Sequence, residues 1–194
     1  MEVYDAIVLA GGGGRRLGGI DKASLAIGSG RLLDRALDAV RGAARVVVVG
    51  PPRDLPAQVT SVVERPPGSG PVAAIAAALP SVESGCVVVL ACDMPFVTSE
   101  TVERLVTAAQ AADASGTDGA WLVDEQGRRQ FLAAAYRLTP LRAALDQLGS
   151  PDGASMRQVV RRLTMTELTA DAGVTLDCDT WDDVHISRYR LEGR

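Results

Sequence analysis

The chain has 194 residues, of which 47% are hydrophobic and 23% charged, and its formal net charge at pH 7 is −4. This composition predicts a folded globular protein, and the negative charge argues against a nucleic-acid-binding protein, which ordinarily has a basic surface. No signal peptide opens the chain and every apolar run is shorter than a membrane span, so we expect a cytoplasmic protein that contacts no membrane.

The first half of the chain alternates between strand and helix patterns. Short valine-rich runs predict strands, and apolar residues three and four positions apart predict helices. The predicted strands are 4–9, 45–50, 60–64 and 85–93, and the predicted helices are 32–44, 71–79 and 100–112. This alternation predicts a three-layer α/β fold with a mainly parallel sheet.

The second half is less regular. Its predicted elements are a β-hairpin of strands 120–124 and 129–136, helices 140–148 and 155–163, and a last strand 174–177. Thr180 and Asp183 then resemble a capping box that begins a terminal helix. We find no internal repeat or long linker, so residues 1–194 are predicted to form a single domain.

A glycine-rich segment with basic side chains follows the first predicted strand. It reads Leu9-Ala10-Gly11-Gly12-Gly13-Gly14-Arg15-Arg16-Leu17-Gly18-Gly19-Ile20-Asp21-Lys22. Glycine lets the backbone approach a ligand closely, consecutive N–H groups bind anions, and Arg and Lys neutralise phosphate charge. The chain has no Gly-Lys pair, which excludes a P-loop, and the segment lacks the glycine spacing of a dinucleotide-binding loop. We therefore predict a nucleotide site of another type.

Acidic residues follow two of the predicted strands. Asp93 ends the fourth strand, and Asp177 and Asp179 lie at the end of the last strand. Ligands of open α/β sheets bind at the carboxyl ends of strands, where one or two carboxylates together with phosphates can hold Mg²⁺. An Asp at a strand end can also be a turn or cap residue, but the cationic loop favours a metal ligand at Asp93.

The three cysteines have no metal-ligand spacing. Cys86, Cys92 and Cys178 are predicted to be reduced, buried thiols, as expected of a cytosolic protein.

Four segments in order along nearly the whole chain resemble the motifs of the molybdenum cofactor guanylyltransferases, a family of small nucleotidyltransferases. The segments are Leu9 to Lys22, Gly70-Pro71-Val72-Ala73-Ala74-Ile75, Cys92-Asp93-Met94-Pro95-Phe96 and Asp177-Cys178-Asp179-Thr180-Trp181-Asp182-Asp183. Gly14 stands where the family usually has Ser, Ala74 replaces a glycine, Trp181 replaces a proline, and Glu64 stands where Asp is expected. None of these differences removes a charged group from the motifs.

The resemblance implies a Rossmann-like αβα nucleotidyltransferase fold with a β-hairpin insertion. Its N-terminal half would bind the nucleotide and its C-terminal half the acceptor. The implied reaction transfers GMP from GTP to molybdopterin, with release of pyrophosphate and Mg²⁺ as cofactor. Proteins that deliver or receive the molybdenum cofactor are candidate partners, and no oligomeric state is implied.

The resemblance also assigns residues to this reaction. Arg16 would contact the β- and γ-phosphates, Lys22 the α-phosphate, and Asp93 the Mg²⁺, aided by Asp177 or Asp179. The expected nucleotide-binding residues are Leu9, Ala10, Gly11, Gly12, Gly13, Gly14, Lys22, Glu64, Gly70, Pro71 and Asp93. The candidates for binding the acceptor are Arg129, Gln130, Ser155 and Arg157, and His185 and the cysteines have no expected role.

The choice of base favours guanine. Leu9-Ala10-Gly11-Gly12 is similar to the guanylyl branch, whereas the cytidylyl branch usually has Leu-Ala-Ala-Gly. A carboxylate such as Glu64 can accept both N1–H and N2–H of guanine, and cytosine offers no such pair of donors. Three alternatives stay open at this point: cytidylyl transfer to molybdopterin, a different phosphate acceptor, and a nucleotide-binding regulatory module without turnover.

Overall fold

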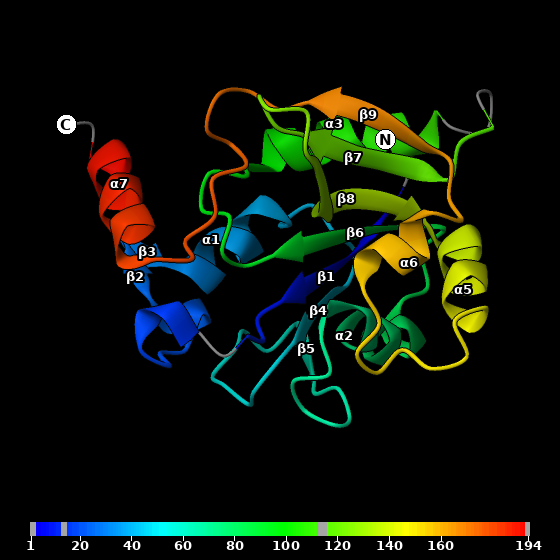
Figure 1. Ribbon diagram of the computed structural model, residues 1–194, viewed down its shortest axis with the longest axis horizontal. Coiled ribbons are helices and arrows are strands. Elements are labelled where there is room, and N and C mark those ends of the chain that lie inside the picture. Colours follow the sequence, from blue (N-terminus) through cyan, green and yellow to red (C-terminus); the bar gives the residue numbers. More distant parts are fainter. Residues whose placement is uncertain (1–2, 13–14, 112–115, 193–194) are drawn as a thin grey trace.

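A seven-stranded sheet forms the centre of the computed structural model, which describes residues 3–12, 15–111 and 116–192 (Figure 1). Its strands are β1 (Asp5–Leu9), β4 (Val46–Val49), β5 (Val59–Val62), β6 (Cys86–Ala91), β7 (Gly119–Val123), β8 (Arg129–Arg137) and β9 (Met165–Thr169). The order across the sheet is β5-β4-β1-β6-β8-β7-β9. Only β8 runs antiparallel to its neighbours, which are β6 and β7. The predicted α/β fold with a mainly parallel sheet and a β-hairpin is therefore confirmed.

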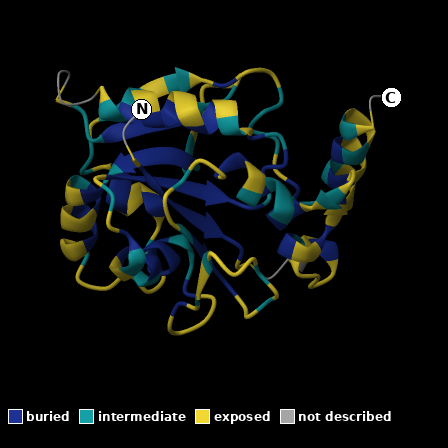
Figure 2. Cartoon of the chain, turned by 180° about the vertical axis from the view of Figure 1, so that it is seen from behind, coloured by how far each residue is buried: buried dark blue, intermediate teal, exposed yellow. Residues whose placement is uncertain are grey.

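Helices cover both faces of the sheet. Helices α1 (Leu32–Ala39) and α3 (Ser99–Gln110) pack on one face, and α2 (Pro71–Ala78), α5 (Leu138–Asp146) and α6 (Met156–Val160) pack on the other. Successive side chains of a strand point to opposite faces. Accordingly Ala6 and Val8 of β1 join the core under α1 and α3, whereas Ile7 and Leu9 join the core under α2. Figure 2 shows the buried strands enclosed between helices that are exposed on their outer sides.

The last helix lies beside the sheet rather than on it. Helix α7 (Trp181–Leu191) lies next to the small two-stranded sheet of β2 (Ala26–Ile27) and β3 (Gly30–Arg31), at one side of the molecule (Figure 1). A separate apolar cluster joins this part of the structure to the chain that follows β1; its buried members are Leu17, Leu25, Ile27, Leu32, Cys178 and Val184. Three short 3-10 helices, η1 (Arg15–Leu17), η2 (Lys22–Ser24) and η3 (Leu79–Ser81), complete the described elements.

The cap residues match the sequence patterns. Gly70 precedes α2 with a φ of 94°, and Pro71 takes the first helical position, as predicted. Thr98 caps α3 by accepting a hydrogen bond from the backbone N–H of Thr101. Thr180 caps α7, and Asp183 completes the predicted capping box. The three cysteines are buried thiols outside any disulfide, and burial raises the pKa of Cys92 to about 12.

The predicted strand 174–177 is wrong. Turn hydrogen bonds fold this segment instead, from Val174 N–H to the Asp171 carbonyl and from Leu176 N–H to the Gly173 carbonyl. Gly173 has a φ of 79°, which an extended strand does not contain. The last strand is β9, which pairs in parallel with β7 and which the sequence pattern missed.

Two helices are shorter than predicted. The helix expected over 32–44 ends at Ala39, because the chain turns at Val40, whose carbonyl accepts a hydrogen bond from Ala43 N–H. At Gly42 a Cβ would lie 3.0 Å from the Tyr4 hydroxyl, so a larger residue there would have to displace the Tyr4 side chain slightly. The helix expected over 155–163 ends at Val160, since Leu163 N–H bonds back to the Val160 carbonyl in a tighter turn.

Candidate active site

A cavity of about 720 Å³ opens at the carboxyl ends of the parallel strands. Its lining comes from the ends of β1, β4, β5 and β6 and from the beginning of α2. The predicted nucleotide-binding residues that line it are Leu9, Gly11, Gly12, Lys22, Glu64, Gly70, Pro71 and Asp93. This is the edge at which open α/β sheets bind ligands.

The ends of β1 and β4 approach each other closely beside this cavity. A Cβ at Gly50, which has a φ of 152°, would lie 2.7 Å from the carbonyl carbon of Ala10. No side chain fits at that distance, so the contact requires glycine. The Gly50 contact therefore fixes the position from which the glycine-rich segment leaves β1, and sequence reasoning missed it.

Three charged side chains meet at the edge of the cavity. The Nζ of Lys22 lies 3.3 Å from Oδ2 of Asp93 and donates a hydrogen bond to Oδ1 of Asp179. The Lys22 side chain is only 16% exposed. Arg16, which is 74% exposed, places Nη1 3.5 Å from Oδ2 of Asp179. The structure thus brings together Lys22, Asp93 and Asp179, which lie far apart in the sequence.

The charges of Asp93 and Asp179 shift the pKa values of two neighbouring groups, Lys22 and Asp177. Burial by itself would lower the pKa of Lys22, but the hydrogen bond to Asp179 and the charges of Asp93 and Asp179 outweigh it, so this pKa lies above its usual value. The pKa of Asp177 is raised, first by desolvation and then by the negative charges of Asp179 and Asp93. Lys22 is therefore a firmly held cation at neutral pH.

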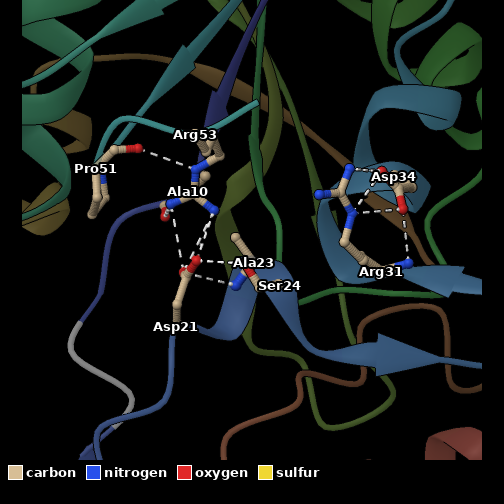
Figure 3. Close-up of polar contacts among 8 residues, drawn as sticks. All are labelled: Ala10, Asp21, Ala23, Ser24, Arg31, Asp34, Pro51 and Arg53. Atoms are coloured by element: carbon tan, nitrogen blue, oxygen red, sulfur yellow. Dashed lines mark hydrogen bonds and ion pairs between the residues drawn. The ribbon is translucent and has the colours of Figure 1, made fainter. Parts of the chain in front are cut away.

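The 3-10 helix that carries Lys22 is held in place by Asp21 and Arg53 (Figure 3). Asp21 accepts hydrogen bonds from Ala23 N–H and from the Ser24 hydroxyl. Arg53, 9% exposed, forms an ion pair of 3.1 Å with Asp21 and donates to the Ala10 carbonyl at 2.9 Å. Arg53 stands in a proline-rich loop without periodicity, so no sequence signal marked it.

Glu64 is buried at the wall of the cavity, with 7% of its surface exposed. Its Oε1 accepts a hydrogen bond of 2.9 Å from Gly68 N–H. Its Oε2 is buried and has no hydrogen-bond partner among the described residues. Buried polar atoms are ordinarily paired, so this oxygen marks a place where a ligand donor fits.

Several predicted site residues are not among those that the structure places in this cavity. Gly13 and Gly14 fall outside the described residues. Ala10 is 3% exposed and contributes its carbonyl to Arg53 rather than to the cavity lining. Asp177 follows a turn instead of ending a strand and lines a different cavity, so the prediction that placed it at a strand end is wrong.

Within the described part of the chain, no group of three or more His, Cys, Asp or Glu side chains is arranged to hold a metal ion. Asp93 and Asp179 form a pair of carboxylates that both contact Lys22 Nζ. Mg²⁺ binds proteins through one or two carboxylates and completes its shell with water and phosphate oxygens. A pair is therefore a sufficient donor set for Mg²⁺ in the presence of a nucleotide.

A second cavity, of about 620 Å³, adjoins the first. The two share the residues Gly68, Gly70, Pro71 and Leu132. Three of the predicted acceptor-binding residues, Arg129, Gln130 and Ser155, line the second cavity. Arg157 lies outside it, in a third cavity, and His185 is exposed on α7.

Comparison with known proteins identifies the family. Residues 6–168 match the family model of the MobA-like NTP transferase domain. A protein of Cupriavidus pinatubonensis named molybdenum cofactor guanylyltransferase is 30% identical over 189 residues, covering 92% of both chains. A protein of Cupriavidus metallidurans with the same name is 28% identical over 189 residues, covering 93% of this chain and 92% of its own.

The fold agrees with this match. The crystal structure of molybdopterin-guanine dinucleotide biosynthesis protein A from Archaeoglobus fulgidus superposes with a TM-score of 0.74 at 22% identity, covering 98% of this chain and 100% of that one. None of the helices described here is long and apolar enough to cross a membrane. The chain belongs to the MobA-like NTP transferase family, and its fold is that of a nucleotidyltransferase.

Proposed function

We propose that the chain transfers GMP from GTP to the terminal phosphate of molybdopterin, forming molybdopterin guanine dinucleotide and pyrophosphate. One observation carries the proposal: a single cavity is lined by a held ammonium group, a carboxylate beside it, and a buried carboxylate oxygen without a partner. These three groups suit the phosphates, the metal ion and the base of GTP, respectively. The names of the curated relatives support the choice of reaction.

Glu64 is proposed to recognise guanine. Glu64 lines the cavity; its Oε1 accepts from Gly68 N–H, and its buried Oε2 has no partner among the described residues. The N1–H and N2–H groups of guanine are adjacent donors that a carboxylate can accept together, whereas cytosine lacks such a pair. Cytosine has only its N4 amino group as a donor on that edge, so it satisfies the carboxylate less fully than guanine does, and an unpaired buried acceptor costs about 1–3 kcal/mol.

Lys22 and Arg16 are proposed to neutralise the phosphates. An oxygen of the acceptor phosphate bonds to the α-phosphorus, while the bond from that phosphorus to the oxygen of the leaving pyrophosphate breaks. Such transfers depend on positioning and on charge stabilisation rather than on covalent chemistry by the protein. Lys22 is the buried cation beside the cavity, and the exposed Arg16 can move toward the departing pyrophosphate. The backbone of Gly11 and Gly12 lines the same space.

Asp93 and Asp179 are proposed to hold Mg²⁺, with Asp177 close enough to shift its pKa in response to their charges. When bound, the ion would supply positive charge to the phosphate oxygens. In the structure, Lys22 contacts both carboxylates. When a nucleotide binds, its phosphate oxygens would replace the carboxylates as partners of Lys22.

The second cavity is proposed to hold the acceptor, so that the N-terminal half binds GTP and the C-terminal half binds molybdopterin within one domain. Its lining joins Gly70 and Pro71 of the nucleotide cavity to Arg129, Gln130 and Ser155. Arg129 is exposed and can contact an anionic group, and Gln130 and Ser155 supply hydrogen-bonding groups suited to a pterin ring.

The test is turnover of the purified chain on molybdopterin with Mg²⁺ and either GTP or CTP, following pyrophosphate and the dinucleotide. We expect the parent to form product from GTP. Asp93→Asn should lower kcat at least about 100-fold, the loss typical when a group that stabilises transition-state charge is removed. Asp38→Asn, an exposed carboxylate on α1, is the matched control. Product from CTP alone would overturn the assignment of the base, and pyrophosphate release only with other phosphate acceptors would overturn that of the acceptor. Nucleotide binding without turnover would indicate a regulatory module.

A further inference from the structure

The third cavity, of about 920 Å³, has an unusually basic lining for a chain of net charge −4. Four arginines line it, Arg128, Arg129, Arg157 and Arg161, against two acids, Glu167 and Asp177. The arginines come from two elements: the first two from the β7–β8 hairpin, and the other two from α6 and its last turn. Four of the 20 basic residues of the chain therefore gather at one hollow.

Two of these four arginines form no ion pair in the part of the chain that the structure describes. Arg129 forms an ion pair of 2.7 Å with Glu167, and Arg128 pairs with Asp124 at 3.5 Å. Arg157 and Arg161 are exposed and make no ion pair with the residues that the structure describes. They are four positions apart, so both side chains lie on the same side of α6.

An aromatic side chain with an unused donor forms the floor of the same cavity. Trp121 is 5% exposed, and its Nε1 is buried without a hydrogen-bond partner in the described part of the chain. The Arg129 guanidinium lies over the indole ring, 5.4 Å from its centroid, and the Phe131 ring meets the indole edge to face. A buried indole N–H ordinarily finds an acceptor. The cavity thus offers guanidinium groups, aromatic surface and one unmatched N–H donor.

We propose that this cavity is a second ligand site, which binds an oligophosphate anion. Guanidinium groups bind phosphate oxygens through pairs of hydrogen bonds. Two arginines on each side of the hollow therefore suit a ligand with adjacent phosphoryl groups better than they suit a ligand with a single carboxylate. The volume lies in the range of small-molecule sites. The ligand is either an inorganic oligophosphate or the phosphate chain of a nucleotide, since both present the same groups.

The site is distinct from the proposed nucleotide cavity, because the two share no lining residue. It touches the proposed acceptor cavity through Arg129, Gln130 and Phe131. Arg157 and Arg161 line the third cavity and neither of the other two, so replacing them tests this inference without removing a residue proposed to bind GTP or the acceptor.

The test is a fluorescence titration of the full chain carrying Trp181→Phe, which leaves Trp121 as its only tryptophan. Sodium tripolyphosphate is added in saturating GTP, with Mg²⁺ in excess over both. We expect a saturable change in Trp121 emission that weakens as NaCl is raised, because salt screens charge. Adding Arg157→Gln and Arg161→Gln should lower the tripolyphosphate affinity at least tenfold while the GTP affinity stays unchanged.

The matched control removes the same charge elsewhere. Arg41→Gln with Arg45→Gln deletes two exposed arginines on the segment that precedes β4, and the tripolyphosphate affinity should not change. The proposal would be overturned if the Arg157/Arg161 variant bound tripolyphosphate as tightly as the parent, or if the control variant bound it as weakly as the Arg157/Arg161 variant. Displacement of tripolyphosphate by GTP or by molybdopterin would also overturn it. Arg157→Lys with Arg161→Lys, which keeps the charge, should bind with intermediate affinity, and thermal unfolding verifies that each variant is folded.

A calorimetric arm distinguishes the two sources of the ligand. The affinities of ATP and of tripolyphosphate are each measured in the presence of saturating GTP. If ATP binds at least tenfold more tightly than tripolyphosphate, the ligand is a nucleotide. Equal affinities identify the phosphate chain alone. Absence of heat with both anions at millimolar concentration would overturn the proposal.

Discussion

Arg53 joins the two ends of the glycine-rich segment: its Nη1 lies 3.1 Å from Oδ2 of Asp21, and its Nη2 donates to the carbonyl oxygen of Ala10 at 2.9 Å (Figure 3). Ala10 lies where the segment leaves β1, and Asp21 immediately precedes Lys22. Within the described part of the chain, the hydrogen bonds of the Arg53 guanidinium go to Pro51, Asp21 and Ala10, and none goes to Lys22 or Asp93. It is a positioning residue, which acts on the site through the backbone of the segment.

Replacing Arg53 tests this role. We expect Arg53→Met to lower kcat/KM for GTP at least tenfold, because Lys22 loses its fixed position, and about 1 Å of misplacement can cost about 100-fold in rate. Arg53→Lys should restore part of the loss by keeping the charge without the paired hydrogen bonds. Steady-state kinetics measures both variants, with exposed Arg41→Met as control. An Arg53→Met variant with unchanged kcat and KM would show that the ion pair is not needed for positioning.

Lys22 provides a second test, in which charge and geometry are separated. Lys22→Ala should reduce kcat by about 10²- to 10³-fold, as expected for removal of a transition-state donor. Lys22→Arg keeps the charge but has a longer, planar head group, so it should recover only part of the activity. Single-turnover kinetics measures the chemical step directly. A Lys22→Ala enzyme that bound GTP weakly but turned over at the parent rate would exclude the catalytic assignment.

Glu64→Gln should narrow the preference for GTP over CTP. The amide keeps the size of the side chain but replaces one acceptor oxygen by a donor, which opposes the N–H groups of guanine. We expect the ratio of kcat/KM values for GTP and CTP to fall about tenfold or more. Glu83→Gln, which changes an exposed carboxylate, is the control. An unchanged ratio would remove Glu64 from base recognition.

Gly50→Ala should destabilise the fold itself. The added Cβ would lie 2.7 Å from the Ala10 carbonyl carbon, and the φ of 152° is unfavourable for any other residue. We expect a loss of about 1–3 kcal/mol in the free energy of unfolding, measured by urea denaturation. Gly85→Ala is the matched control, because nothing lies within 4 Å of its Cβ position. Equal stability of the two variants would contradict the close approach of β1 and β4.

Asp183 gives a dependence of stability on pH. Burial acts to raise its pKa, but hydrogen bonds from the Thr180 hydroxyl and from the N–H groups of Thr180 and Asp179 outweigh it, so the pKa is lowered. A lowered carboxyl pKa contributes stability that is present above the unfolded-state value and is lost as pH falls through the folded-state value. The free energy of unfolding of the parent should therefore exceed that of Asp183→Ala by about 1 kcal/mol at pH 7, a magnitude typical of capping residues.

Denaturant titrations at several pH values measure this difference. It should shrink as the pH falls below the usual carboxyl pKa, about 3.9, and vanish once Asp183 is also protonated in the folded state. Asp182→Ala, the neighbouring acid that does not complete the capping box, should show no such trend. A difference that stays constant with pH would mean that the charge of Asp183 is not what stabilises the beginning of α7.

The sequence predicted the elements whose signal is local. Consecutive valines in β4 and β6 indicate strands buried on both faces, and the glycine-rich segment indicates a phosphate site without any tertiary information. The edge strand β9 (Met165–Thr169) carries no such signal, because three of its five residues are polar and none is buried, and the strand is ordered by pairing with β7. The segment 174–177 has strand-like residues, yet the positive φ of Gly173 turns the chain there.

The residues of the candidate site also fall into two groups, those marked by a local sequence motif and those positioned by tertiary contacts. Lys22 and Asp93 belong to recognisable motifs and lie together as predicted. Arg53, Gly50 and the unpaired Glu64 oxygen depend on which loops approach one another, and a single sequence does not contain that information. Tertiary contacts between distant segments, rather than local propensity, determine these positions.

Lys22 is the only lysine among the 20 basic residues of the chain. Apart from an α-amino terminus, the protein therefore has a single primary amine, and that amine is 16% exposed and protonated between two carboxylates. A protonated amine is not a nucleophile, so acetylating and succinimidyl reagents should label Lys22 of the native protein only slowly at neutral pH. Release of Lys22 from Asp93 and Asp179 exposes it to the same reagents, so the extent of labelling measures how often this cluster of ion pairs opens.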